Sequence, residues 1–158
     1  MSAADPAVTL RGARDEDQAF FGGVYASARE QELAPLPWTP EQKAAFLAAQ
    51  FAAQSAHYAR HHAEARYAVI VVDGEPAGRL IVARGEQELC IVDIALLPPF
   101  RGRGIGTGLL HTLIAESEGS GRKLSIHVEA NNPARTLYDR LGFRPTGEDG
   151  VYVAMERA

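Results

Sequence analysis

The residues best suited to chemistry lie in one glycine-rich stretch between two apolar segments. The stretch reads Phe100-Arg101-Gly102-Arg103-Gly104-Ile105-Gly106-Thr107-Gly108. Glycine lets successive backbone N–H groups converge on one point without a Cβ in the way. A helix that begins in this stretch adds its free amides and the positive end of its dipole. We therefore predict a loop that binds a polyphosphate.

Two widespread phosphate-binding patterns do not fit this loop. The nucleoside triphosphatase pattern ends in Gly-Lys followed by Ser or Thr, and the chain contains no such run. The dinucleotide pattern G-x-G-x-x-G fails as well, because its last glycine falls on Thr107 when the pattern starts at Gly102. The remaining pattern is Arg101-x-x-Gly104-x-Gly106, after a predicted strand and before a predicted helix.

Two side chains near this loop in the predicted fold are candidates for accepting a proton. Asp93 interrupts the apolar run from Cys90 to Leu96, where a carboxylate is costly unless it is paired or faces a cleft. A hydrogen bond to a neighbouring loop explains it equally well. His127 alternates with apolar residues of its strand, and histidine's ordinary pKa of ~6.5 suits a base. If a bound substrate must lose a proton, we predict that Asp93 or His127 accepts it as the general base. Glu129, acting through water, is a further candidate.

Other reactive residue types favour ordinary structural roles. His57 and His61 have the i, i+4 spacing of metal ligands, but no carboxylate or third ligand completes a site, so we interpret them and His62 as a solvated helix face. His111 is expected at the surface. Cys90 is the one cysteine, which rules out an internal disulfide, and its apolar strand indicates a small core residue.

The elements that must position these residues follow from hydrophobic periodicity and turn signals. Asp15 is predicted to cap the first helix, and Thr39 with Pro40 and Gln42 forms a capping box for the second. The helices are expected over 15–29, 40–63, 105–119 and about 132–141, and the strands over 7–11, 66–72, 77–84, 88–96, 123–128, 143–148 and 151–156. The strands between 66 and 96 read as antiparallel hairpins, and the strand–helix–strand unit after Leu96 implies a parallel crossover.

Composition places the chain among ordinary globular domains. It has 158 residues, of which 46% are hydrophobic and 23% charged, with a formal net charge of −4. That charge does not favour nucleic acid as a partner. No apolar run reaches the ~20 residues of a membrane span, and the first residues lack signal-peptide features. We expect a single domain over 1–158 in the cytoplasm, with no membrane association.

The loop and a second motif together resemble the GNAT superfamily of N-acetyltransferases. The family's acyl-CoA loop reads Gln/Arg-x-x-Gly-x-Gly/Ala after a strand that ends in Val-x-Pro, and here Leu96-x-Pro98 precedes the loop. The second motif is the run Asn131-x-x-Ala134-x-x-Leu137-Tyr138-x-x-Leu141-Gly142-Phe143. The order of elements fits along nearly the whole chain. The resemblance implies an α/β (α+β) GNAT fold: a twisted, mostly antiparallel mixed sheet of about seven strands, flanked by about four helices on both faces.

The resemblance also implies roles for individual residues. The backbone of Ile94, Ala95 and Leu96 would pair with the pantetheine arm of acetyl-CoA, because the fourth and fifth strands separate there. The Leu96 amide would polarise the thioester carbonyl, and the amides from Gly102 to Thr107, with Arg103, would hold the pyrophosphate. Arg101 would touch phosphate or pack its stem on Phe100. Asn131 would bind the pantetheine or order its loop, and Tyr138 would protonate the departing thiolate; its alternative is to cover the helix's apolar face.

The implied activity is acetyl transfer from acetyl-CoA to a primary amine of a small molecule or peptide, without a metal. A non-catalytic acyl-CoA sensor is the alternative from another class, and transfer of a longer acyl group or to a hydroxyl is a third. Glu32 and Trp38 lie in the segment where the family builds its acceptor pocket, although Trp38 would serve equally as a cap on the core. Homodimers are common in the family, and the sequence carries no diagnostic for one.

Overall fold

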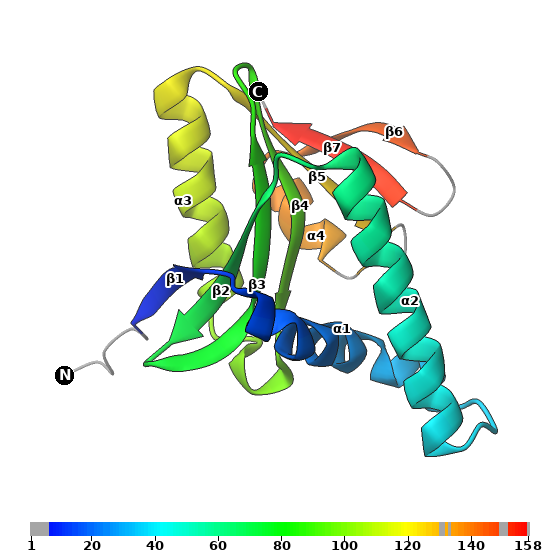
Figure 1. Cartoon of the computed structure of the whole chain (residues 1–158). Coiled ribbons are helices and arrows are strands. Elements are labelled where there is room, and N and C mark those ends of the chain that lie inside the picture. The colour runs from blue at the N-terminus through cyan, green and yellow to red at the C-terminus, as the bar shows by residue number, and fades with distance from the viewer. Residues whose placement is uncertain (1–6, 130–131, 133, 149–151, 158) are drawn as a thin grey trace.

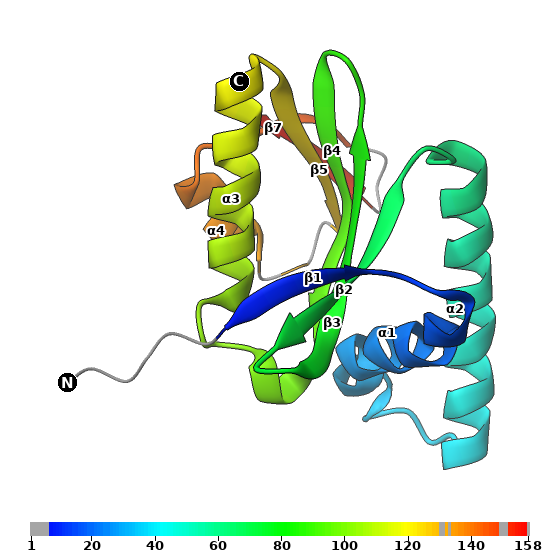
Figure 2. The ribbon, with the colours of Figure 1, turned by 60° about the vertical axis from the view of Figure 1, so that its left-hand side comes forward.

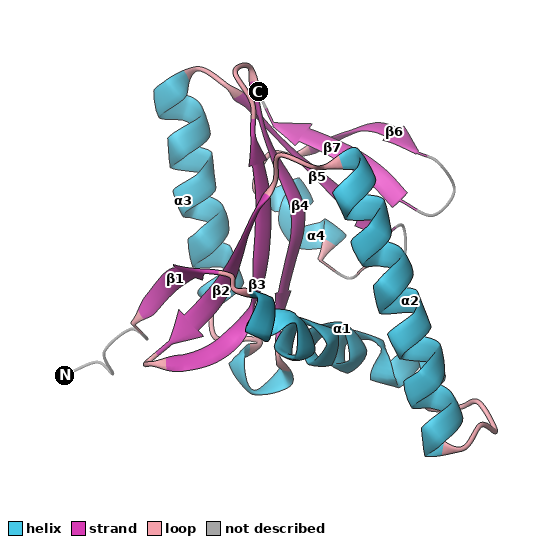
Figure 3. Cartoon of the chain, viewed as in Figure 1, coloured by secondary structure: helices cyan, strands magenta, loops and turns pink. Residues whose placement is uncertain are grey.

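The computed structural model describes residues 7–129, 132, 134–148 and 152–157. The elements in chain order are β1 (Val8–Gly12), the 3-10 turn η1 (Asp15–Asp17), α1 (Gln18–Leu33), α2 (Pro40–His61), β2 (Arg66–Val72), β3 (Glu75–Arg84), β4 (Glu88–Leu96), the 3-10 turn η2 (Pro98–Phe100), α3 (Ile105–Ser120), β5 (Lys123–Glu129), α4 (Arg135–Arg140), β6 (Arg144–Glu148) and β7 (Tyr152–Arg157). Figures 1 and 3 show how they lie around one sheet. In the described part of the chain, every helix is too short or too polar to cross a membrane.

The sheet has seven strands in the order β1-β2-β3-β4-β5-β7-β6. Strands β4 and β5 run parallel, while the other described neighbours pair antiparallel. Figure 2 shows the sheet between two helical layers, with α3 and α4 on one side and α1 and α2 on the other. The predicted mixed sheet, its parallel crossover and its helices on both faces are confirmed. The closing hairpin is confirmed too, with β7 rather than β6 beside β5.

The main core lies between the sheet and the α3–α4 layer. Alternate residues of β4 and β5 point into it, so Leu89, Ile91, Leu124 and Ile126 are almost fully buried. The buried side of α3 packs against them. Burial of each large aliphatic side chain stabilises the folded state by about 1.5–3 kcal/mol. The packing of α3 on the sheet therefore holds the start of α3, and the loop before it, in place.

The start of α1 differs from the sequence prediction. Asp15 does not cap a helix; it opens the 3-10 turn η1, and α1 begins only at Gln18. The carboxylate that organises this start belongs to Asp17, which accepts the backbone N–H of Arg14 at 2.7 Å and two bonds from Arg11 of β1. The helix also continues past the predicted end at Arg29, because Leu33 packs into a small cluster with Tyr25 and Leu47.

The second helix begins as predicted. Thr39 accepts the N–H of Gln42, and Gln42 accepts the N–H of Thr39, which is the expected capping box. Toward its C-terminal end, Tyr58 packs on Ile81 and Val92, on the sheet face opposite the main core. This contact brings the end of α2 over strands β3 and β4.

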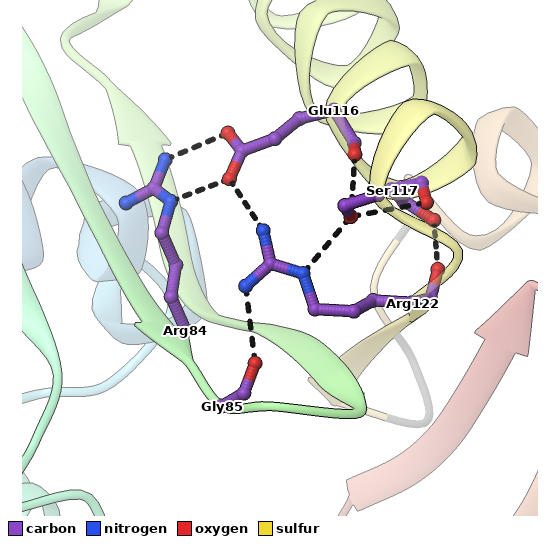
Figure 4. A network of polar contacts seen from close by, with 6 residues as sticks. Arg84, Gly85, Glu116, Ser117 and Arg122 are labelled. Carbon is purple, nitrogen blue, oxygen red and sulfur yellow. Dashed lines mark hydrogen bonds and ion pairs between the residues drawn. The ribbon is translucent and has the colours of Figure 1, made fainter.

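A polar network ties the far end of α3 to the β3–β4 hairpin (Figure 4). Glu116 accepts two hydrogen bonds from Arg84 of β3, at 2.7 and 3.1 Å, and pairs with Arg122 at 3.5 Å. Arg122 also donates to the carbonyl of Gly85 in the hairpin turn, and Ser117 donates to the carbonyl of Arg122. The network fixes the hairpin against α3, well away from the glycine-rich loop.

Candidate active site

The site is an opening in the sheet where β4 and β5 stop pairing. Their parallel ladder runs from Glu88↔Lys123 to Ile91↔Ile126 and ends there, although both strands continue. Val92 is an extra residue in β4, because Ile81 of β3 pairs with Asp93 while Val82 pairs with Ile91. Such a bulge bends its strand and increases the local twist, which carries the rest of β4 away from β5.

The continuing part of β4 presents unpaired backbone groups to this opening. The N–H of Leu97 donates to Ala77 of β3 at 2.8 Å. Because successive residues of a strand turn their amides to opposite edges, the N–H groups of Leu96 and Ile94 face the open edge. The separation of the two strands is thus present where the family resemblance implied it. An extended chain that carries amides can pair with this edge as an added strand.

The glycine-rich loop leads from this edge into α3. Gly102 and Gly104 adopt the left-handed backbone, with φ of 71° and 78°, and Gly104 is the N-cap of α3. The first described bond of the helix runs from the N–H of Gly108 to the carbonyl of Gly104. The amides of Ile105, Gly106 and Thr107 therefore have no partner within the helix and suit an anion.

The two arginines of the loop point to different places. Arg101 Nε donates to the carbonyl of Leu96 at 2.9 Å, and its Nη2 lies 3.4 Å from the Ser27 hydroxyl of α1. It is Arg103, rather than Arg101, that lies over the ring of Phe100, 5.8 Å from its centroid. Arg103 also lines a pocket of about 510 Å³ against the first turns of α3 and beside β1, together with Val8, Gly104, Ile105, Gly108, Leu109 and Thr112.

Tyr138 of α4 is buried on the α3–α4 side of the sheet. Its side chain packs in the main core, with its ring centroid 5.9 Å from that of Phe143. Burial, with a smaller contribution from the negative charge of Asp93, raises the pKa of Tyr138 to about 12.

Asp93 is held by a buried arginine. Arg79 of β3 donates from both Nε and Nη2 to one carboxylate oxygen of Asp93, and from Nη2 to Gln54 of α2 at 2.9 Å. The Arg79 side chain is only 4% exposed, whereas that of Asp93 is 22% exposed. Its guanidinium also lies 5.5 and 5.7 Å from the ring centroids of Phe21 and Phe51. The partner of the Asp93 carboxylate is thus a buried arginine of the neighbouring strand, and not a hydrogen bond to a neighbouring loop.

His127 follows the last residue of β5 that pairs with β4, and its exposed side chain lies on the α2 side of the sheet. Its Nδ1 is 3.9 Å from the sulfur of Cys90 on β4, and its ring centroid is 6.3 Å from that of His62. Of the predicted site residues, Asn131 lies outside the described residues, and so does the side chain of Glu129. Asp93 to Leu96 lie on β4 beyond its ladder with β5, Gly102 to Thr107 lie in the loop and the first turn of α3, and Tyr138 lies in the main core.

Sequence reasoning missed two members of this region. Arg79 interrupts the apolar run of β3 much as Asp93 interrupts that of β4, and two opposite charges in neighbouring apolar strands are the signal that pairs them. The second is His62, for which the sequence predicts a solvated helix face. That holds for His57 and His61, which are exposed, but it is wrong for His62, which is half-buried at the end of α2. The helix ends at His61, and His62 is its C-cap with a backbone that is no longer helical, so the helical periodicity does not predict the burial of His62. The exposed position of His111 is confirmed.

Comparison of the sequence with curated proteins finds N-acetyltransferases that are similar to part of this chain. A Bacillus subtilis protein provisionally named a ribosomal protein bS18-alanine N-acetyltransferase is 34% identical over 85 residues, which are 52% of this chain and 56% of that protein. The ribosomal protein bS18-alanine N-acetyltransferase of Haemophilus influenzae is 38% identical over 36% of this chain and 40% of its own length. The chain thus matches about half, or less, of the length of these curated relatives.

Solved structures share the fold along nearly the entire chain. The PaiA N-acetyltransferase of Thermoplasma acidophilum, solved with coenzyme A, superposes with a TM-score of 0.69 over 96% of this chain and 98% of its own, at 15% identity. Arabidopsis thaliana Naa50, solved with the bisubstrate analogue CoA-Ac-MVNAL, superposes with a TM-score of 0.59 over 96% and 98%, at 18% identity. The model of the acetyltransferase (GNAT) family matches residues 25–143, and the chain therefore belongs to this family.

Proposed function

We propose that the protein transfers an acetyl group from acetyl-CoA to a primary amine of a peptide or small molecule. The observation that carries the proposal is the end of the β4–β5 ladder at Ile91 and Ile126, directly beside a loop with free amides. The curated relatives named as alanine N-acetyltransferases and the neighbours solved with coenzyme A or its analogue support the same activity.

The residues present fit the two halves of acetyl-CoA. The amides of Ile105, Gly106 and Thr107, with the cation of Arg103 beside them, suit a diphosphate, because its many oxygens need several donors at once. The open edge of β4 at Ile94 and Leu96 offers amides to the amide-bearing pantetheine arm. When bound, acetyl-CoA supplies the thioester that is to be attacked. In the proposed arrangement, the Leu96 amide donates to the carbonyl oxygen, on which negative charge develops.

The two helical layers then take different parts of the reaction. Asp93 and His127 lie on the α2 side, so the amine is proposed to approach from that side. His127 accepts the proton that the amine must lose, and Asp93, already engaged by Arg79, holds the backbone at the bulge. Tyr138 lies on the α4 side and donates a hydrogen bond to the departing thiolate. Opposite layers thus serve the entering nitrogen and the leaving sulfur.

We also propose that residues 1–158 form a single domain that acts in the cytoplasm. The main core draws on residues from β1 to β7, and the remaining clusters lie on the other face of the same sheet. A peptide acceptor is favoured by the names of two curated relatives, which are ribosomal protein bS18-alanine N-acetyltransferases.

A two-part assay tests the proposed function. Calorimetry should show that acetyl-CoA binds, and release of free thiol should then follow on addition of an acceptor from a panel of alanine-initiated peptides, polyamines and other small amines. Matched hydroxyl compounds and longer acyl-CoA donors serve as controls, and each should react more slowly. Binding without turnover on the whole panel would instead indicate an acyl-CoA sensor. No binding up to millimolar concentration would overturn the assignment of the loop.

A further inference from the structure

The histidines at the end of α2 meet β5 next to the sheet opening. The rings of His57 and His61 lie 4.5 Å apart, and that of His62 lies 6.4 Å from His57 and 6.3 Å from His127. Figure 1 shows the C-terminal end of α2 near β5. His62 therefore lies between His127, at the opening, and the exposed histidines of α2. Among the described residues, these side chains do not form a group that could hold a metal ion.

The proposed reaction releases one proton in each turnover. A primary amine enters as an ammonium, loses one proton before it attacks and a second when the amide forms, while the C–S bond breaks and the thiolate takes up one proton. The balance is ammonium plus acetyl thioester giving amide, thiol and one proton. Because an amine of pKa ~10.4 is almost wholly protonated near neutral pH, the surplus proton has to leave from the side on which the amine enters.

We infer that His62 acts through His127 as the second carrier of this proton, which it passes to the surface of α2. The inference rests on the proposed function. Nδ1 of His127 faces the sulfur of Cys90, and among the described residues no hydrogen bond engages its Nε2. Ring centroids 6.3 Å apart bring the two side chains within reach of a bridge through one water. His62 thus acts through His127: it accepts the proton that His127 takes from the amine.

The surroundings of His62 favour its neutral, proton-accepting form. Burial lowers the pKa of His62, and the charges of His127, then His57 and His61, lower it further. The C-terminal end of the α2 dipole acts in the opposite direction. The other titratable groups packed nearby are Tyr58, whose ring lies 6.0 Å away, and Cys90 beside His127; burial raises the pKa of both. Among the described residues, no carboxylate pairs with either ring.

Kinetics as a function of pH tests the inference. With an acceptor that the wild type acetylates, His127→Gln should lower kcat about 100-fold and His62→Gln about tenfold at pH 7, with an unchanged dissociation constant for acetyl-CoA. His111→Gln, on the exposed surface of α3, should stay within about twofold. The loss in His62→Gln should shrink as the pH rises through the pKa of the acceptor, which is about 8 for an N-terminal amine and ~10.4 for a lysine-like amine, and added imidazole should restore part of it. An equal loss at every pH without rescue, or no loss, would contradict the relay.

A second measurement keeps the inference separate from the proposed function. The titration of His62, followed by NMR in the complex with acetyl-CoA, needs no acceptor. His127→Gln should raise the pKa of His62 more than His57→Gln or His61→Gln does, because His127 is the strongest of the three charges that lower it. Equal effects of the three variants would overturn the pairing of His62 with His127. A wild type that binds acetyl-CoA but acetylates no amine would overturn the proposed function while leaving this pairing intact.

Discussion

Tyr138 shows how a residue's surroundings limit its chemistry. Its pKa of about 12 keeps the phenol protonated at neutral pH, but complete transfer of its proton to a thiolate of pKa ~8.5 would be uphill by about 5 kcal/mol. A hydrogen bond to the developing charge avoids that cost and becomes stronger in a buried site. The proposed role of Tyr138 is therefore to stabilise the leaving sulfur by a hydrogen bond rather than to protonate it fully.

Tyr138→Phe removes this hydrogen bond while it keeps the ring that packs on Phe143. We expect kcat to fall about 10- to 100-fold at pH 7, with the affinity for acetyl-CoA within about twofold of the wild type. Steady-state kinetics with calorimetry measures both. Tyr67→Phe, which removes a half-buried phenol from β2, is the control and should keep kcat. An undiminished kcat in Tyr138→Phe would leave the tyrosine a packing role only.

Arg79→Met breaks the ion pair with Asp93 and leaves the largely buried carboxylate of Asp93 without its partner. We expect the free energy of unfolding to fall by about 3 kcal/mol, because the loss of one partner of a buried pair leaves an uncompensated charge. The double variant with Asp93→Asn should recover part of this loss. Denaturant titration measures both. Arg14→Met is the control, since its ion pair with Glu16 is exposed and should contribute below about 1 kcal/mol.

At the element scale, strands β3 and β4 approach so closely near the opening that one position requires glycine. A Cβ at Gly78 would overlap the backbone carbonyl oxygen of Ala95, next to the edge at Leu96. Gly78→Ala should therefore displace the end of β4, lower the melting temperature and weaken acetyl-CoA binding at least tenfold. Gly147→Ala, where a Cβ meets nothing within 4 Å, is the matched control on β6. Wild-type affinity in Gly78→Ala would show that the edge of β4 does not hold the donor.

The junction of β1 with α1 should make stability depend on pH. The hydrogen bonds from Arg11 and the Arg14 amide lower the pKa of Asp17 to about 2, below its value in the unfolded chain. This contribution is present above about pH 4 and is lost as the pH falls toward 2. The free energy of unfolding of Asp17→Asn should thus fall less steeply over that range than that of the wild type. Asp15→Asn, on the same turn, should follow the wild type; an unchanged slope in Asp17→Asn would contradict the junction's role.

The elements were predictable where local rules decide them. The Thr39 capping box, the strands 66–72 and 88–96 and the helix after Gly104 lie where periodicity and turn signals put them. The start of α1 was not, because a contact between Asp17 and Arg11 of β1 overrides the cap expected at Asp15. The bulge at Val92 was not predictable from periodicity either, since it arises from the pairing of β4 with β3.

Across the whole molecule, the backbone features of the candidate site that face acetyl-CoA could be predicted from the sequence. The residues that contact Asp93 and His127 could not. The loop amides and the edge of β4 are backbone features of a contiguous segment, so the sequence motif identifies them. The ion pair of Asp93 with Arg79 and the approach of His62 to His127 join elements that are distant in the chain, and only the packing of α2 on the sheet brings them together.

The most direct test of the account is the mass of an acceptor after incubation with the protein and acetyl-CoA. We expect an alanine-initiated peptide or a small amine to gain one acetyl group, with an equal amount of free coenzyme A, and His127→Gln and Tyr138→Phe to slow both. The same peptide with a blocked N-terminus and no lysine should gain nothing. Tight binding of acetyl-CoA with no acetylated product from any acceptor would contradict the central claim that the opening between β4 and β5 is a transferase site.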